Sequence, residues 1–115
     1  MLTVNDPLKS YDYATLAVTG EIRVERDRQN TKWGEQNHPM GTGIGPYWAE
    51  RAEVEKQVND YRVERGTLTW LDILAEEVYE AFAESDLYKL RTELIQVAAV
   101  AVAWVEALDR RTDGS

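Results

Sequence analysis

The sequence predicts an all-α, four-helix bundle-like fold, and two observations support this prediction. Apolar residues recur at helical spacing in four stretches, and no stretch shows the alternation typical of a β-strand. The connections between these stretches are either rich in glycine and proline or only a few residues long. A chain of 115 residues is expected to form one domain, spanning residues 1–115.

The first half of the chain combines a weakly patterned helix with a long loop. Residues 1–13 look irregular, and the helical pattern runs from near Tyr13 to Lys32, with Gly20 weakening its early part. Residues 33–46 hold four of the seven glycines and two of the three prolines, which predicts a loop. Long loops in small domains are usually functional or disordered. We expect its Gly-Thr-Gly-Ile-Gly segment to be a flexible connector that could close over a substrate.

The second and third helices have clear boundary signals. The second is expected from Tyr47 to Arg65, ending at Gly66, a residue that readily terminates helices. The third follows Thr69, which can form a capping box with Asp72 three residues later. On a helical wheel Asp72 points away from the apolar face, toward the side where charged residues normally lie.

The fourth helix is expected at residues 87–110, with only Ser85 and Asp86 between it and the third. From residue 94 to residue 105 its only polar side chain is Gln96. A helix that is apolar on all sides is normally buried. We therefore expect this helix, including Gln96, to be buried, and so short a chain to self-associate.

Composition narrows the range of functions. A net charge of −8 argues against gripping nucleic acid through its phosphates, although a divalent cation between acids and a small phosphorylated substrate would reverse the local sign. Without cysteine the chain cannot form disulfides or thiolate metal sites, and its single histidine, His38, excludes histidine-based zinc sites. The N-terminus lacks the apolar core of a secretory signal, and no apolar run is long enough to span a bilayer. We expect a cytoplasmic protein with no membrane partner.

Acidic residues lie on the apolar side of the third helix. On the wheel, Glu77 falls inside the apolar arc and Glu80 at its edge, whereas Glu76 points outward. On the fourth helix, Glu93 lies one turn before Gln96 on nearly the same face. Because the short connection makes the two helices antiparallel neighbours, the inward-facing oxygen-bearing side chains are expected to converge.

Converging carboxylates need a positive partner. An unpaired buried carboxylate is costly or takes up a proton, and several together repel one another. The inward faces of the two helices carry no lysine or arginine, since Lys89 and Arg91 sit near the turn. A hard cation bound by oxygens is the simplest solution, and Mg²⁺ suits carboxylates combined with substrate phosphates. The open alternative is a subunit interface where the acids meet arginine from another chain.

The segment AEEVYEAFAESDLYKLRTELIQ resembles the MazG-like nucleotide pyrophosphohydrolases of the all-α NTP pyrophosphatase superfamily. Their signature is E-E-x-x-E and, after a gap, E-x-x-D on two adjacent antiparallel helices. Here EEVYE runs from Glu76 to Glu80, and ELIQ begins at Glu93 after twelve intervening residues. The resemblance covers the last two helices, and Gln96 stands where the family carries aspartate.

The resemblance implies an activity and a set of metal ligands. Such enzymes use Mg²⁺, with Mn²⁺ as a substitute, to hydrolyse a nucleoside or deoxynucleoside triphosphate to the monophosphate and pyrophosphate. The implied ligands are Glu77, Glu80, Glu93 and Gln96, whose amide oxygen contributes no charge. Glu76, outside this set, is the candidate to orient the attacking water. Relatives assemble as dimers or pairs of dimers, which implies a homodimer or homotetramer here.

The stretch from residue 28 to residue 38 carries groups suited to a nucleotide. An aromatic ring can stack on a base, amide and imidazole groups can read its edge, and cations can bind phosphates. The candidates for substrate binding are Arg28, Lys32, Trp33, Gln36 and His38. The simpler alternative places Trp33 as an anchor of the loop to the core and His38 in solvent. The phosphate-binding cations could also come from another subunit.

Two other classes of function stay open. Gln96 is compatible with a catalytically weak protein that binds or sequesters nucleotides on the same fold. A metal-free helical interaction module would explain the acids if they meet arginine across an interface. Pyrophosphate release separates the first from an enzyme, and metal binding separates the second.

Overall fold

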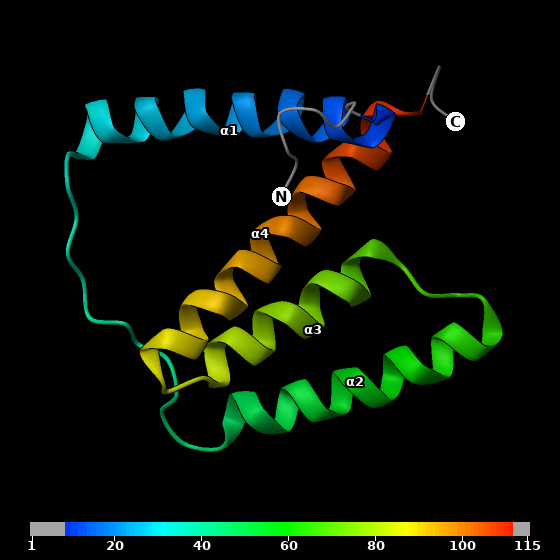
Figure 1. Ribbon diagram of the computed structural model, residues 1–115. Coiled ribbons are helices and arrows are strands. Elements are labelled where there is room, and N and C mark those ends of the chain that lie inside the picture. Colours follow the sequence, from blue (N-terminus) through cyan, green and yellow to red (C-terminus); the bar gives the residue numbers. More distant parts are fainter. Residues whose placement is uncertain (1–8, 112–115) are drawn as a thin grey trace. The chain divides into compact units, whose positions relative to one another are not determined.

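The computed structural model describes residues 9–111, which contain four α-helices and no β-strand. These are α1 (Ser10–Trp33), α2 (Tyr47–Arg65), α3 (Trp70–Ala83) and α4 (Leu87–Asp109) (Figure 1). The all-α prediction is confirmed. The chain divides into two compact units, one formed by residues 1–38 with 102–115 and the other by residues 39–101. That the chain forms one domain stays a prediction.

The start of α1 corrects the expected irregular segment. The helix begins at Ser10 rather than near Tyr13, and it continues through Gly20. The backbone N–H of Lys9 donates a hydrogen bond of 2.8 Å to Asp12 Oδ2. A carboxylate in the first turn satisfies an unpaired N–H and lies favourably in the helix dipole. The part of the expected irregular segment before Lys9 lies outside the described residues.

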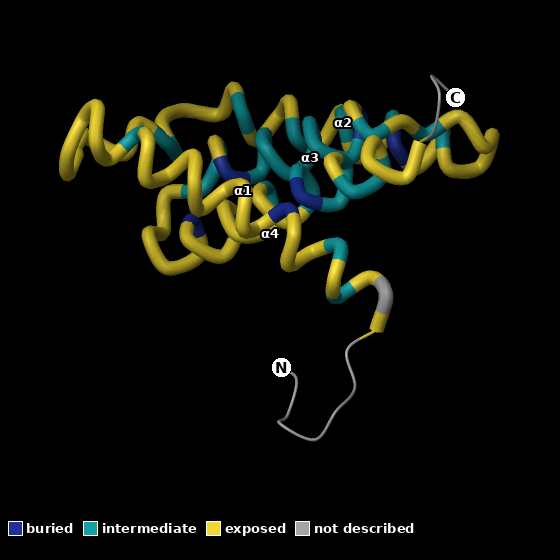
Figure 2. The backbone as a smooth tube through the Cα atoms, turned by 90° about the horizontal axis from the view of Figure 1, so that it is seen from above, coloured by how far each residue is buried: buried dark blue, intermediate teal, exposed yellow. Residues whose placement is uncertain are grey.

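The first unit joins α1 to the last turns of α4. Most of α1 is exposed, as Figure 2 shows by its nearly continuous yellow trace. Among the described residues of this unit, Val18 of α1 and Val102 of α4 are the buried apolar ones. The Thr15 hydroxyl of α1 donates to Glu106 Oε2 of α4 at 2.8 Å. Because charged side chains surround much of α1, only a narrow stripe of the helix is available for packing.

The helix boundaries at Gly66 and Thr69 match the expected local chemistry, and Asp86 adds a cap that was not predicted. Gly66 ends α2 in the left-handed conformation with φ of 69°. Thr69 caps α3, and the predicted capping box with Asp72 is present. Asp86 caps α4 by accepting hydrogen bonds at its Oδ1 from the N–H groups of Tyr88 (2.9 Å) and Lys89 (3.0 Å). These caps satisfy N–H groups that a helix start leaves unpaired.

Aromatic rings join α2 to α3. The Trp48 ring stacks on Tyr79 with centroids 5.6 Å apart, and it meets Phe82 edge-on at 4.9 Å. Ala81 and Leu90 are the buried apolar residues of this unit. Aromatic pairs at these separations add stabilisation to the burial of their rings. This packing holds α2 beside the face of α3 that the helical wheel had assigned to solvent.

The glycine-rich connector contacts the end of α3. The N–H of Gly43 donates to the carbonyl of Phe82 at 2.8 Å. A Cβ atom at Gly43 would lie 2.6 Å from the Cα of Ser85, and the φ of 72° is one that other residues rarely adopt. Gly43 is therefore a close-packed contact and not a free hinge, because only glycine lets the two backbones approach this closely.

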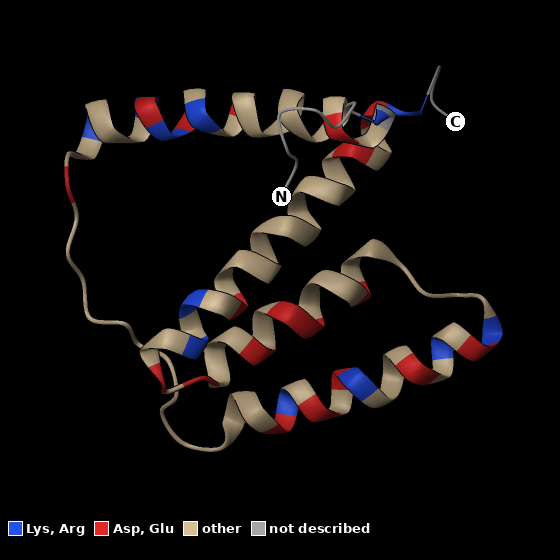
Figure 3. Ribbon diagram, in the orientation of Figure 1, with Lys and Arg blue, Asp and Glu red and all other residues tan. Residues whose placement is uncertain are grey.

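The exposure of α4 corrects the expectation that this helix is buried. Its uncharged middle is visible as the tan stretch in Figure 3, yet Leu94 and Ile95 are 49% and 57% exposed. Gln96 is exposed as well. A neighbouring helix covers only one stripe of its partner, so a single chain leaves the other sides of α4 uncovered. None of the described helices has the length and apolar character needed to cross a membrane.

Candidate metal centre

Three glutamates from α3 and α4 converge within the second unit. Each offers a carboxylate oxygen, and these oxygens all lie within 4.8 Å of one another. The residues are Glu77, Glu80 and Glu93. Glu77 and Glu80 are one turn apart on α3, and Glu93 projects from α4, as the spacing of the two motifs predicts. All three side chains are half-buried.

The cluster disfavours its own negative charge. Burial raises the pKa of Glu77 above its usual 4.5, and the charges of Glu93 and Glu76 raise it further. Burial also raises the pKa of Glu80, followed by the charges of the neighbouring glutamates, while Lys56 acts in the opposite direction. Desolvation and like charges both penalise the carboxylate form. A bound cation would offset this penalty, and the excess of negative charge would strengthen its binding.

Gln96 joins the cluster through its amide. The amide lies 3.1 Å from Glu93 Oε2 and 3.2 Å from Glu77 Oε2. With its nitrogen turned toward these oxygens, the amide donates a hydrogen bond to each carboxylate. The expected convergence of Gln96 with the acids is therefore observed, although the side chain is exposed and not buried. Its rotation by half a turn would present the amide oxygen instead.

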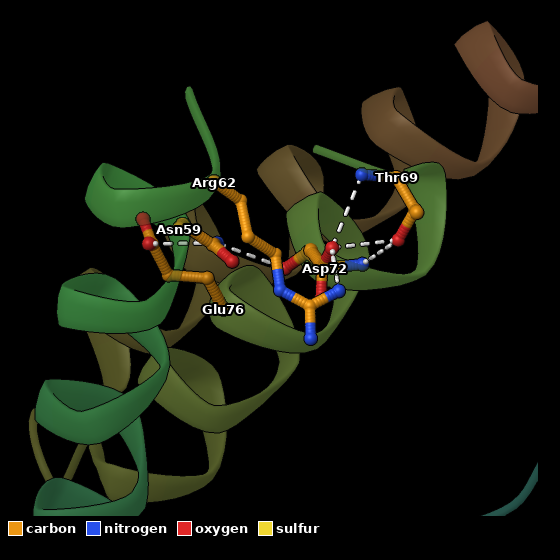
Figure 4. A network of polar contacts seen from close by, with 5 residues as sticks. All are labelled: Asn59, Arg62, Thr69, Asp72 and Glu76. Carbon is orange, nitrogen blue, oxygen red and sulfur yellow. Dashed lines mark hydrogen bonds and ion pairs between the residues drawn. The ribbon is translucent and has the colours of Figure 1, made fainter. Parts of the chain in front are cut away.

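Glu76 faces α2 and not solvent. Asn59 of α2 donates from Nδ2 to Glu76 Oε1 at 3.1 Å and to the Asp72 carbonyl at 3.0 Å (Figure 4). Asn59 is only 8% exposed, and its Oδ1 has no hydrogen-bond partner among the described residues. This contact holds Glu76 at a defined position one residue before the first cluster glutamate. The wheel placed Glu76 outward because it could not include α2.

Asp72 is likewise buried, in contrast to its expected outward position. It is 6% exposed, and its Oδ2 accepts hydrogen bonds from the Thr69 hydroxyl at 2.7 Å and the Thr69 N–H at 3.1 Å. Arg62 completes the network with an ion pair of 3.2 Å (Figure 4). These partners, the Thr69 hydroxyl above all, lower the pKa of Asp72 below its usual 3.8. We refer to Thr69, Asp72 and Arg62 as the capping network.

A hollow of about 330 Å³ adjoins the acidic cluster and brings in a residue that the sequence analysis missed. Glu80 and Glu93 line it together with Lys56 of α2. No cationic side chain was expected beside the acids, because that expectation rested on the faces of α3 and α4 alone. The sequence does show that Ala49, Ala52 and Lys56, spaced three and four positions apart, share one face of α2. Nothing in that spacing indicated that the face packs beside the acids.

The proposed substrate-binding residues lie in the first unit. All five are exposed or paired locally: Arg28 forms an ion pair with Glu25, and Lys32 Nζ lies 4.8 Å from the centroid of the Trp33 ring. Gln36 Oε1 and His38 Nε2 are 3.0 Å apart. The Trp33 side chain is 60% exposed, so it does not anchor the loop in the core of its unit. Their contact with a nucleotide stays a prediction.

A second hollow, of about 600 Å³, lies within the first unit beside the end of α1. Arg26 lines it and donates hydrogen bonds to Gln29 Oε1 at 2.6 Å and Asn30 Oδ1 at 3.1 Å. Gln36, one of the predicted substrate-binding residues, lines the same hollow. The remaining four predicted residues do not.

The chemistry of the converging side chains is restricted to oxygen. The cluster offers three carboxylates and one amide, the chain has no cysteine, and the single histidine belongs to the other unit. Oxygen donors of this kind suit Mg²⁺ and Mn²⁺ and not the softer transition metals. The residues present therefore fit a hard divalent cation.

Comparison with known proteins adds no family assignment. The chain matches no protein-family model, and neither the curated proteins nor the solved structures yield a match.

Proposed function

We propose that the protein is a Mg²⁺-dependent nucleoside triphosphate pyrophosphohydrolase of the MazG-like type. The observation that carries the proposal is the convergence of Glu77, Glu80 and Glu93 to within 4.8 Å. Two of these carboxylates have a raised pKa, which indicates a site where negative charge is in excess. The resemblance of EEVYE and ELIQ to the family signature supplies the reaction.

The chain's own residues suggest a division of roles. Glu77, Glu80 and Glu93 would hold the cation, with the Gln96 amide turned to present its oxygen. A bound Mg²⁺ would neutralise phosphate oxygens and polarise the phosphorus that is attacked. Mn²⁺ would fit the same oxygen donors.

Glu76 is the proposed base. Asn59 occupies its Oε1, which leaves Oε2 to accept a proton from the attacking water. The water oxygen would bond to the α-phosphorus as the bond from that phosphorus to the bridging oxygen breaks. Pyrophosphate leaves with the electron pair of that bond, and the monophosphate stays behind with the new oxygen.

The proposal extends to assembly as a homodimer or homotetramer. Exposed leucine and isoleucine side chains on α4, at Leu94 and Ile95, are the supporting observation. Contiguous apolar side chains of this kind are typically covered by a partner. A second copy of the chain is the occupant that the family resemblance implies.

A second candidate function is favoured by Gln96. An amide in place of a carboxylate lowers the negative charge available to a cation, which suits a protein that binds nucleotides without efficient turnover. The distinction is between binding and hydrolysis and does not change the site.

A substrate screen tests both functions. We expect pyrophosphate release from at least one nucleoside or deoxynucleoside triphosphate in Mg²⁺, and none after chelation with EDTA. Binding of a triphosphate without pyrophosphate release in Mg²⁺ or Mn²⁺ would support sequestration. Calorimetry that detects neither metal nor nucleotide binding by the folded protein would contradict both and favour a metal-free interaction module.

A further inference from the structure

The hollow beside the acidic cluster is lined by one cationic side chain. It is lined by four glutamates, Glu53, Glu80, Glu84 and Glu93, and by Lys56, an exposed residue of α2. Three alanines, Ala49, Ala52 and Ala83, also line it. Small side chains leave room that longer ones would fill, so a hollow of about 330 Å³ stays open beside Lys56.

Lys56 is not committed to an ion pair. No carboxylate within residues 9–111 forms a salt bridge with its ammonium group. Its side chain nevertheless lies beside the cluster, since it lines the same hollow as Glu80 and Glu93. A lysine that faces acids without pairing with them keeps its three N–H donors for another acceptor.

We propose that Lys56 binds the phosphate groups of the substrate in this hollow, beside the acidic cluster. This inference rests on the proposed function. A polyphosphate next to three glutamates meets strong repulsion, which a metal ion relieves only at the oxygens that it touches. An ammonium group that lines the same hollow would hold the remaining phosphate oxygens as a point charge. Lys56 would thereby supply the phosphate-binding cation from within the same unit as the acids.

The competing role for Lys56 is purely structural. In that case the lysine would only reduce the repulsion among the glutamates, and its removal would alter the metal site itself. The two roles differ in what they do to metal binding without phosphate. If the lysine binds phosphate, its removal leaves metal binding intact, or tightens it because a positive charge near the cluster is lost.

The test compares Lys56→Gln with Lys89→Gln, which changes the net charge equally at an exposed lysine that does not line the hollow. Calorimetry measures binding of inorganic pyrophosphate in saturating Mg²⁺, and electron paramagnetic resonance measures binding of Mn²⁺ alone. We expect Lys56→Gln to weaken pyrophosphate binding at least about tenfold and to raise the KM for the triphosphate, with Mn²⁺ binding not weakened. Lys56→Arg should restore much of the pyrophosphate binding.

Two results would overturn the inference. One is equal pyrophosphate binding by Lys56→Gln and Lys89→Gln. The other is a parallel loss of Mn²⁺ and pyrophosphate binding, which would assign Lys56 a structural role. Failure of the proposed function looks different: wild-type protein would bind pyrophosphate through Lys56 yet hydrolyse no triphosphate, and the inference would then stand for a binding protein.

Discussion

Two polar clusters that include residues of α3 differ in how their carboxylates are surrounded. In the capping network, Asp72 is surrounded by donors from Thr69 and by the Arg62 guanidinium, and its pKa is lowered. In the acidic cluster, Glu77 and Glu80 face other glutamates, and their pKa values are raised. One carboxylate is satisfied by its own chain, whereas the others are left in excess.

The difference separates a carboxylate with a structural role from the carboxylates to which we assign the proposed function. A carboxylate that accepts three hydrogen bonds stabilises the helix start and has no further need for a ligand. Carboxylates that repel each other reduce stability, and such sites are more often retained for binding or catalysis. Changes in the acidic cluster should therefore affect metal binding and turnover, whereas changes in the capping network should affect stability alone.

The largest expected effect is that of Glu77→Gln on turnover. Loss of a metal ligand removes charge stabilisation of several kcal/mol, so the rate should fall about a hundredfold or more. Pyrophosphate release measures the rate, and Mn²⁺ titration should show weakened metal binding. Glu64→Gln, an exposed change on α2, is the control. An unchanged rate in Glu77→Gln would remove Glu77 from the site.

Glu76→Gln should separate catalysis from metal binding. The glutamine oxygen can still accept the hydrogen bond from Asn59, so the local structure is preserved. Loss of a general base typically costs on the order of 100-fold or more in rate, and we expect that loss in kcat. Mn²⁺ affinity should stay close to that of the wild type. Weakened Mn²⁺ binding with an unchanged kcat would make Glu76 a ligand and not the base.

Gln96→Glu should strengthen the metal site. A fourth carboxylate next to Glu77 and Glu93 adds attraction for a cation, and we expect about tenfold tighter Mn²⁺ binding, or about 1.4 kcal/mol. The metal-free variant should be less stable, because the hydrogen bonds from the amide are replaced by repulsion. Gln29→Glu adds the same charge at a residue that is not part of the acidic cluster, and it should leave Mn²⁺ binding unaffected.

Thr69→Ala tests the capping network. Removing the side chain that accepts the Asp72 N–H should lower the free energy of unfolding by about 1 kcal/mol. Mn²⁺ affinity and turnover should be retained, since Thr69 does not contact the acidic cluster. Thermal or urea unfolding measures the change, with Thr67→Ala in the exposed loop as the control. A drop in metal affinity would mean that the two clusters are coupled.

The smallest effect is the pH dependence of stability in the metal-free protein. Folding raises the pKa of Glu77 and Glu80 above 4.5. Both residues therefore contribute to the free energy of unfolding at pH values below 4.5, where they are protonated. This contribution is lost as the pH rises through the raised pKa values. Asp72 acts in the opposite sense, and its contribution is lost as pH falls below 3.8, through its lowered pKa. Urea unfolding in EDTA should show the decline above pH 4.5, and saturating Mg²⁺ should suppress it. Glu77→Gln with Glu80→Gln should flatten that limb; an unaltered slope would contradict the assignment.

The helices themselves could largely be predicted from local sequence. Gly66 and Thr69 mark the end of α2 and the start of α3 through chemistry confined to a few residues. The early start of α1 at Ser10 was missed because its signal is a single carboxylate, Asp12, without an apolar pattern. The convergence of Glu77 with Glu93 was also predictable, since helical phase and a short connection determine which side chains meet.

What lies on the other side of α3 could not be predicted in this way. Asp72 and Glu76 looked solvent-facing because a helical wheel contains one helix and not its neighbours. The packing of Trp48 against Tyr79 places α2 on that face of α3. Asn59 of α2 therefore contacts Glu76, and Lys56 of α2 lines the hollow beside the acids. Sequence spacing alone does not tell which stripe of α2 meets α3.

The amino-acid sequence by itself determined that four helices form, where α2 ends and α3 begins, and that acids of α3 and α4 converge, because these features depend on local chemistry, helical phase and one short connection. The tertiary structure decided that Asp72 is neutralised while Glu77 is not, that Asn59 holds Glu76, and that a lysine faces the acids. Those outcomes depend on contacts between residues far apart in the chain, where side-chain packing and desolvation, and not local propensity, set the free energy.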